Sequence, residues 1–360
     1  MLPSRYCDRV TEQPRQPVTI YDVAKAAGVA PSTVSRTFAR PGRVNAETAE
    51  RIRQIAQQLG YRANPVGQAP STNRTHLLGL MVADVANPFH AQLTRGAQVA
   101  ATEAGYELLL ADSRESALRE RAALERLVPV VEGFIIGVSR MPDNALRTIA
   151  KQRPMVVLNR ELRGVPSVVM DNPSGMRAAL DHLQALGHES VTYVAGPEAS
   201  YADGVRFRTL RDHGAAVGLH THRVGPFLPT FEGGLKAAEQ LAERPPTAVI
   251  AYNDLVAVGV INGLRRAGLK VPEHVSVIGF DDILIARLVT PSLTTVSSPS
   301  RQMGITAVGN VLAMIKGARP ANTEAMVMPV QLKVRESTGQ RRRKRVSPAL
   351  GTIIVSGSSS

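Results

Sequence analysis

Residues 19–36 read TIYDVAKAAGVAPSTVSR and predict two short helices joined by a glycine turn. Thr19 followed three residues later by Asp22 is typical of a helix N-cap with an acidic first turn. Gly28 ends that helix, because glycine adopts the left-handed conformation of a helix C-terminus without strain. Pro31 then suits the first turn of a second helix.

A third helix is predicted beyond this stretch, over residues 46–60. Asn45 is placed to cap it, and apolar side chains recur in one stripe at helical spacing: Ala49, Ile52, Ile55, Ala56 and Leu59. In the second helix, Ser32 and Arg36 lie four residues apart and hence on one face, where a hydroxyl and a guanidinium suit base edges or phosphates. Three such helices indicate a helix-turn-helix DNA reader; the alternative is a three-helix bundle with a solvated polar face.

The strings TIYDVAKAAGV and STVSR, followed by RIRQIAQQLGYRANP, resemble the headpiece of the lactose/galactose repressor (LacI/GalR) family of transcription factors. The resemblance implies that Pro31, Ser32 and Arg36 read bases. It also implies backbone-contact or capping roles for Thr19, Tyr21, Thr33, Ser35 and Asn45. Ala30 departs from the family, which usually has a serine cap there, and loss of such a cap costs about 1 kcal/mol.

The formal net charge of +13 is concentrated at the two ends of the chain. Residues 1–62 carry +5 and residues 333–345 carry +6, whereas the region between them is nearly balanced. Basic ends beside a neutral core favour contact with a polyanion; the alternative is that they only aid solubility.

From Leu77 onward, short apolar runs such as LLGLMVAD, SVTYVAG and HVSVIGFDD alternate with helix-like stretches. Continuous apolar strands separated by helices predict parallel sheets that are covered on both faces. The units are too many for one ordinary sheet, so we expect an α/β core of two doubly wound lobes. Polar side chains at the strand ends would converge on a ligand in the cleft between them.

This region also resembles the core of the same repressor family, which is similar to periplasmic sugar-binding proteins. The matching stretches are ADVANPFHAQLTRGAQVAATEAGYELLLADS, PPTAVIAYNDLVAVGVINGLRRAG and VPEHVSVIGFDDILIARLVTPSLTTV. The resemblance implies that the chain crosses between lobes three times, with a helix over 299–316 returning to the first lobe. It implies effector contacts at Phe89, Asn159, Arg206, Phe227, Asn253 and Asp281, with Asp84 and Asp282 as further candidates.

No catalytic pattern accompanies these features. A phosphate-binding GxxxxGK[ST] loop, a nucleophile elbow and a GxGxxG motif behind the first strand are all missing from the sequence. His220 and His222 are read as ordinary surface residues rather than metal ligands. We therefore expect no enzymatic activity, no cofactor and no metal site.

The stretch NPVGQAPSTNRT, residues 64–75, falls where the resembled family has a hinge that becomes helical on operator DNA. Asn64 would cap such a helix, but Gly67 lowers helix propensity and Pro70 removes a backbone donor. The sequence therefore predicts a weakened hinge.

The predicted domains follow from these patterns. They are a disordered extension over 1–17, a helix-turn-helix domain over 18–63, a hinge over 64–75, a two-lobed ligand-binding and dimerisation domain over 76–338, and a basic disordered tail over 339–360. The first lobe is expected to comprise about 76–160 and 293–317, and the second about 161–292 and 318–338.

The functional prediction is a dimeric repressor that binds pseudo-palindromic operator DNA and is controlled by a sugar or sugar acid. The alternatives are a cytoplasmic sugar-binding protein without sequence-specific DNA binding, and a Rossmann-type enzyme. A single cysteine, Cys7, the lack of a signal-peptide pattern and the shortness of the first apolar run favour a cytoplasmic protein without membrane contact.

Overall fold

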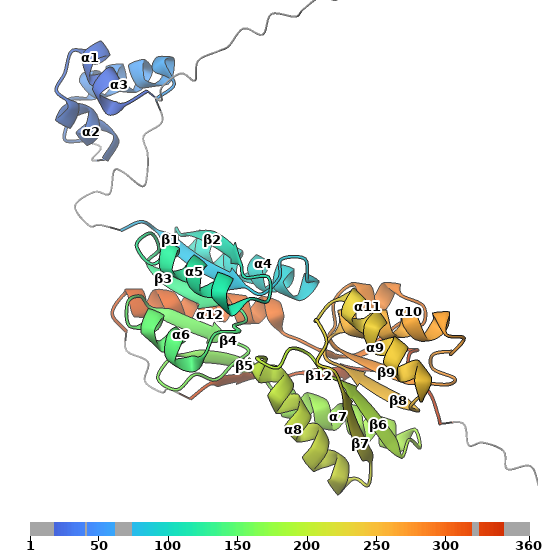
Figure 1. The fold of residues 1–360 in the computed structure, drawn as a ribbon. Coiled ribbons are helices and arrows are strands. Elements are labelled where there is room, and N and C mark those ends of the chain that lie inside the picture. Colours follow the sequence, from blue (N-terminus) through green and yellow to red (C-terminus); the bar gives the residue numbers. More distant parts are fainter. Residues whose placement is uncertain (1–17, 40–41, 62–73, 319–323, 342–360) are drawn as a thin grey trace, which may run out of the picture. The chain divides into compact units, whose positions relative to one another are not determined.

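The computed structural model describes residues 18–39, 42–61, 74–318 and 324–341. They form two compact units that divide between Thr75 and His76 (Figure 1). The extension over 1–17, the hinge residues Asn64, Gly67 and Pro70, and the tail beyond Arg341 lie outside the described residues. In the described part, no helix is long and apolar enough to cross a membrane.

The first unit has the three predicted helices, α1 (Ile20–Ala27), α2 (Pro31–Ala39) and α3 (Ala46–Leu59). They enclose a small core: Val23, Ala24, Ala27, Val34, Ile52 and Ala56. The glycines that end α1 and α3, Gly28 and Gly60, have φ values of 64° and 70°, as left-handed C-caps require. Leu59 was predicted in the apolar stripe but is 40% exposed, because it lies in the last turn of α3 and reaches past the core.

The second unit contains two six-stranded sheets, one in each lobe. In the first lobe the order is β11 (Met326–Met328), β5 (Ser167–Met170), β4 (Met155–Leu158), β3 (Gly133–Ile136), β1 (Leu77–Val82) and β2 (Glu107–Asp112), all parallel. In the second lobe it is β12 (Gln331–Lys333), β10 (Thr294–Ser297), β9 (Ser276–Asp281), β8 (Ala248–Ala251), β6 (Ser190–Val194) and β7 (His220–Val224). Only β12 runs antiparallel to its neighbour among these described strands.

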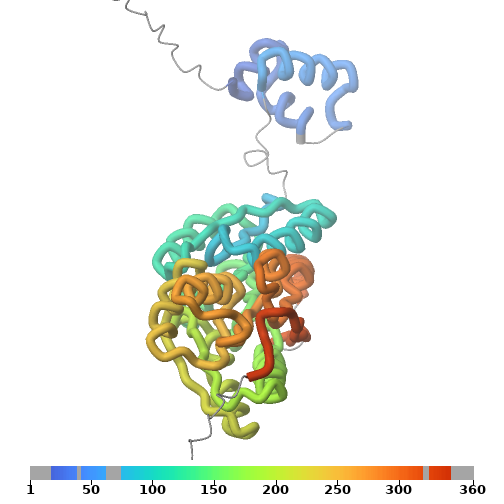
Figure 2. The backbone as a smooth tube through the Cα atoms, turned by 90° about the vertical axis from the view of Figure 1, so that its right-hand side faces the viewer, coloured from blue at the N-terminus to red at the C-terminus, as the bar shows by residue number. Residues whose placement is uncertain are grey.

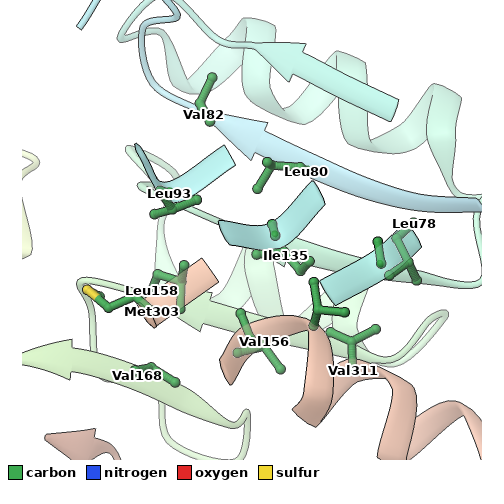
Figure 3. Packing of buried hydrophobic residues seen from close by; sticks show 14 of the residues in the cluster. Leu78, Leu80, Val82, Leu93, Ile135, Val156, Leu158, Val168, Met303 and Val311 are labelled. Carbon is green, nitrogen blue, oxygen red and sulfur yellow. The ribbon is translucent and has the colours of Figure 1, made fainter. Parts of the chain in front are cut away.

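Helices cover both faces of the first-lobe sheet, as the continuous apolar strands predict. Leu80 points to the face covered by α4 (Pro88–Glu103) and α12 (Ser300–Ile315), and the next residue, Met81, points to the face of α5 (Ala117–Leu127) and α6 (Asp143–Ala150). Figure 3 shows the first of these cores, in which Val311 and Met303 of α12 lie among side chains of β1, β3, β4 and β5.

The second lobe is built in the same way. One face of its sheet packs against α7 (Asn172–Ala185) and α8 (Tyr201–Ala216). The other face packs against α9 (Phe231–Glu243) and α10 (Asp254–Arg266), and the short α11 (Ile285–Leu288) lies at its end. The predicted doubly wound architecture is therefore present in both lobes.

The chain crosses between the lobes three times, after β5, after β10 and after β11. Figure 2 shows α12, coloured orange, lying with the N-terminal strands of the first lobe, as predicted for 299–316. The predicted lobe boundaries were wrong for three strands: β5 and β11 belong to the first lobe and β10 to the second. These memberships depend on pairing between distant segments, such as Val168 with Met326, which local hydrophobic patterns do not contain.

Candidate functional site

The second helix of the first unit presents the predicted base-reading residues to solvent. Pro31, Ser32 and Arg36 are exposed on α2, whereas Val34 and Thr37 on its opposite face are buried. The face that carries a hydroxyl and a guanidinium is therefore the face left free by the three-helix core, which a DNA-reading helix requires.

The residues expected at backbone-contact or capping positions fall into two groups. Tyr21 is 70% exposed on α1, and Thr33 and Ser35 are half-buried on α2. The other two cap helices: Asp22 Oδ2 accepts from the hydroxyl of Thr19 at 2.7 Å, and Asn45 Oδ1 accepts from the backbone N–H of Glu47 at 2.9 Å. Contacts of these residues with DNA remain predictions.

The hydrogen bonds that cap α1 also affect the ionisation of Asp22. Asp22 Oδ2 also accepts from the backbone N–H of Thr19 at 2.8 Å, and the side-chain and backbone hydrogen bonds from Thr19 lower the pKa of Asp22 below its ordinary value. The start of α2 has no such partner, because Ala30 stands at its N-cap and offers only its carbonyl, 2.8 Å from the N–H of Thr33.

In the second unit, polar and aromatic side chains from both lobes line one cleft. The first lobe contributes Asn87, Phe89, His90, Glu115, Val138, Ser139, Arg140, Asn159, Arg160 and Met170. The second lobe contributes Ser200, Tyr201, Ala202, Arg206, Pro229, Tyr252, Asn253 and Asp281. Five of the predicted effector residues therefore lie together here: Phe89, Asn159, Arg206, Asn253 and Asp281.

The other predicted residues lie outside this cleft. Asp84 shapes the turn after β1, where its Oδ1 accepts from the N–H of Ala86 at 2.9 Å. Phe227 packs against the α9–α10 core of the second lobe. Asp282 is held in ion pairs with Arg335 and Arg287. Effector contacts by these three residues remain predictions; in the structure each side chain has partners of its own, and Asp282 lines a neighbouring cavity with Phe89 and Asp281.

Arg206 is fixed in place by groups of its own lobe. Its Nε donates to Asn172 Oδ1 at 2.7 Å and its Nη1 to the carbonyl of Tyr252 at 2.5 Å. The guanidinium also stacks over Phe280, with 3.9 Å between its carbon and the ring centroid. A buried guanidinium held on two sides in this way is preorganised to meet an acceptor in the cleft.

Asp281 stands at the carboxyl end of β9, with a φ of 116° that is unusual for a residue with a side chain. Burial raises the pKa of its carboxyl to about 7, although nearby Arg206 opposes the rise. Asn253, after β8, caps α10 by accepting from the N–H of Val256 and donates its amide to the carbonyl of Pro229 at 3.0 Å. Both residues occupy strand ends, where the sequence predicted ligand groups.

Three polar atoms on the first-lobe wall of the cleft are buried without a hydrogen-bond partner among the residues that the structure describes: His90 Nδ1, Asn159 Oδ1 and Arg160 Nε. Burial lowers the pKa of His90 to about 4, so its imidazole is neutral and can both donate and accept. Unpaired buried polar groups are costly and are typical of places where water or a ligand completes the set.

Several cleft residues were not among the predicted site residues, above all His90, Glu115, Arg140, Tyr201 and Tyr252. Tyr252 directly follows β8, so its strand-end position was a usable signal. Arg140 lies in the loop after β3 and Glu115 in the loop after β2, and only the folded lobe brings them together.

Comparison with known proteins identifies the family. A family model described as bacterial regulatory proteins, lacI family, matches residues 19–64, and one described as a periplasmic binding protein-like domain matches residues 180–338. The chain is 33% identical over 333 residues to the HTH-type transcriptional repressor CytR of Escherichia coli (strain K12), which covers 89% of this chain and 96% of that protein. It is 34% identical over 322 residues to the HTH-type transcriptional regulator GalS of Salmonella typhimurium (strain LT2), covering 87% and 94%.

Similar solved structures belong to the same family of regulators. The lac repressor dimer bound to operator and the anti-inducer ONPF superposes with a TM-score of 0.75 at 26% identity, covering 90% of this chain and 100% of that chain. A complex of the transcriptional regulator CelR with cellobiose gives a TM-score of 0.65 at 29% identity, covering 89% and 99%. With the three-helix headpiece and the two-lobed core in place, the chain belongs to the LacI family of bacterial transcriptional regulators.

Proposed function

We propose that this protein is a dimeric transcriptional repressor whose headpiece binds operator DNA and whose cleft binds a sugar or sugar acid. The observation that carries the effector site is the meeting of Arg206, Asn253 and Asp281 with Phe89 and Asn159 in one cleft lined by both lobes. Carboxylate, amide and guanidinium groups around an aromatic ring suit a polyhydroxylated ligand, because each hydroxyl both donates and accepts. The related proteins bound to operator or to cellobiose support both halves of the proposal.

The DNA half rests on the exposed face of α2. Pro31 offers a base only apolar contact, whereas Ser32 and Arg36 offer hydrogen bonds. Two half-sites need two readers, which is why a dimer is part of the proposal. Because its target is chromosomal DNA, we place its action in the cytoplasm.

In the proposed mechanism, the effector binds one arrangement of the two lobes more tightly than another. It therefore shifts the population of lobe angles, and with it the population of subunit pairs that can engage both half-sites. An effector that weakens operator binding is an inducer, and one that strengthens it is a corepressor.

The effector is to be found by thermal unfolding in the presence of D-ribose, D-xylulose, cellobiose and the aldonic acids of ribose and cellobiose. A ligand at 100 times its Kd stabilises the folded state by about 2.7 kcal/mol, which raises the unfolding temperature. The same rise in the Asp281→Asn protein would remove Asp281 from the site. No rise with any of these compounds would argue against this effector class.

The DNA half is tested by selecting bound sequences from a random library and measuring affinity for the selected palindrome. Arg36→Ala is expected to weaken binding by about 1–3 kcal/mol and to relax the preference at one position of each half-site. Arg53→Ala is the matched control, since Arg53 is an exposed arginine on α3 that pairs with Glu50. Selection of no common sequence would favour the alternative, a sugar-binding protein without sequence-specific DNA binding.

A further inference from the structure

The first residue of the second unit, His76, forms an unusual bend just before β1. Its φ is 54°, in the left-handed region that residues other than glycine seldom adopt, although the residue is exposed. A conformation of this kind is costly and persists where neighbouring groups enforce it. The bend lies where the chain enters the ligand-binding unit, directly after the predicted hinge over 64–75.

Hydrogen bonds on both sides of the strand hold the backbone of His76. Its N–H donates to Glu132 Oε1 at 2.8 Å, and its carbonyl accepts from the N–H of Glu107, the first residue of β2, at 2.9 Å. Just before β3, the N–H of Glu132 also donates to the carbonyl of Leu77 at 2.8 Å. Because β1 lies between β2 and β3 in the sheet, the bend is fixed from both neighbouring strands.

The carboxylate of Glu132 is in turn held by Tyr106. The hydroxyl of Tyr106 donates to Glu132 Oε2 at 3.0 Å, and the residue packs in the core between the sheet and the helices α4 and α12. The ring of Tyr106 also lies against the imidazole of His76, with 5.1 Å between the ring centroids. One carboxylate therefore joins the entering chain to a residue of the core, with one oxygen for each. We refer to His76, Tyr106 and Glu132 as the entry clamp.

The entry clamp lies at one end of β1, and the cleft lies beyond its other end. The strand spans only Leu77–Val82, and the next residue, Ala83, accepts from the N–H of Glu115 in the cleft lining at 2.9 Å. An unclamped strand end frays, because its outermost hydrogen bonds open at little cost. Fraying would lengthen the segment that joins the headpiece to the first lobe, and a longer segment allows a wider range of headpiece positions.

We propose that Glu132 is a positioning residue for DNA binding, which together with Tyr106 fixes the point where the chain leaves the first lobe toward the headpiece. A fixed exit point limits the separation and the angle at which the two headpieces of a dimer reach their half-sites. The inference rests on the proposed function, because it requires an operator with two half-sites. Loss of the entry clamp then relaxes the preference for one spacing of the half-sites.

The test compares operators that differ only in this spacing. The palindrome selected by the full chain is synthesised with one base pair inserted or removed between its half-sites, which rotates one half-site by about 35° and moves it by about 3.4 Å. The Kd for each DNA is measured at one fixed salt concentration, because phosphate contacts make affinity depend on salt. The readout is the ratio of the Kd at each altered spacing to the Kd at the selected spacing. A smaller fraction of folded protein weakens binding to every DNA equally and leaves these ratios unchanged.

Glu132→Ala should lower both ratios at least about twofold, because each residue released from the strand adds up to about 3.3 Å of reach, as much as one base pair. Glu132→Gln is the conservative variant: its amide oxygen can accept from His76 and its amide group can donate to the hydroxyl of Tyr106, so the ratios should stay near those of the wild type. Glu125→Ala is the matched control, since Glu125 is an exposed carboxylate of the same lobe that pairs with Arg121 at 2.8 Å.

Hydrogen exchange measured by mass spectrometry reports the clamp itself. Glu132→Ala should speed exchange of the amides at residues 76–79, and Glu125→Ala should not. Faster exchange together with unchanged Kd ratios would show a purely structural role and would overturn the proposal. If Glu132→Ala does not fold, Tyr106→Phe decides: it removes one of the two hydrogen bonds to the carboxylate, and wild-type ratios in that variant would also overturn it.

The outcomes separate this inference from the proposed function. A chain that selects no palindrome contradicts the proposed function, and the positioning role is contradicted with it. A chain that selects a palindrome but binds all three spacings equally well contradicts the positioning role alone. Equal ratios in the wild type and in folded Glu132→Ala do the same.

Discussion

Asp254 ties the first turn of α10 to the segment that directly follows Asp281: its Oδ2 accepts the backbone N–H of Ile283 at 2.9 Å. Its Oδ1 accepts the hydroxyl of Thr295 on β10, and the whole residue is buried. Asp281, the last residue of β9, and Asp282 come directly before Ile283, and both have positive φ. One buried carboxylate therefore holds the strand end from which Asp281 enters the cleft.

Replacement of Asp254 by alanine should leave the N–H of Ile283 and the hydroxyl of Thr295 without partners. Each buried donor left unpaired costs about 1–3 kcal/mol, so the free energy of unfolding should fall by several kcal/mol. Urea denaturation followed by circular dichroism measures the loss. Asp143→Ala is the comparison, since Asp143 is a half-exposed carboxylate that pairs with Arg147 and Arg160, and its loss should cost about 1 kcal/mol or less. Equal losses would show that Asp254 is not a structural tie.

The carboxyl of Asp281 should make stability depend on pH. The folded protein keeps its proton up to a pKa of about 7, whereas the unfolded chain releases it near 3.8. The folded state therefore binds more protons between these values, and stability falls as the pH rises through this interval. Asp281→Asn has no carboxyl to ionise at this position and so avoids this loss of stability. The unfolding temperature of the variant minus that of the wild type should therefore be larger at pH 8 than at pH 4.5.

His90 titrates over an overlapping range in the opposite sense. Its pKa is lowered from 6.5 to about 4, so its contribution to stability is lost as the pH falls through that range. Both proteins in the comparison keep His90, so its contribution cancels from the difference, which reports Asp281 together with the buried Asp254, whose pKa the Asp281 charge helps to raise. A difference in unfolding temperature that stays constant across the pH range would contradict the assignment.

The helices α4 and α12 pack so closely that one added methyl group should disturb the contact between them. A Cβ at Gly304 would lie 2.2 Å from the carbonyl oxygen of Leu93, a backbone atom that cannot move aside. Gly304→Ala should therefore destabilise the protein by about 1–3 kcal/mol. Gly309→Ala on the same helix is the matched control, because outside the local backbone of α12 no described atom lies within 4 Å of its Cβ position, and alanine favours helix. Similar stability of the two variants would show that α12 can shift away from α4.

The architecture was predictable because hydrophobic periodicity is a local property of the chain. The headpiece caps, the apolar strands and the returning helix α12 all follow from short-range patterns or from resemblance to the family. The assignment of β5, β10 and β11 to lobes was not predictable, because it depends on which distant strand each one pairs with, as when Thr295 meets Lys333.

The same distinction separates the parts of the cleft. Asn253 and Asp281 stand at strand ends, and parallel strands bring such ends to one edge of a sheet, so position along the chain indicated the site. Arg140 enters the cleft only because Glu115, on a strained loop, and Glu120, on a helix, turn it there. Phe227 also follows a strand, but its ring packs against apolar side chains of the second lobe. Positions at strand ends thus reduce the number of candidate ligand-binding residues. Tertiary packing then decides which of those side chains face the cleft.

Addition of the missing cap to the DNA-reading helix should stabilise it. Ala30 is exposed and its carbonyl accepts from the N–H of Thr33, so a serine hydroxyl at this position could accept from the same turn. Ala30→Ser should stabilise α2 by about 1 kcal/mol, which slows hydrogen exchange of its backbone amides about fivefold where exchange follows local opening. Exchange measured by mass spectrometry on the full chain reports α2 separately from the lobes. Ala26→Ser is the control: Ala26 is an exposed position inside α1, where serine lowers helix propensity, so exchange should be unchanged or faster. Unchanged exchange of α2 in Ala30→Ser would show that Pro31 already fixes the start of this helix without a side-chain cap.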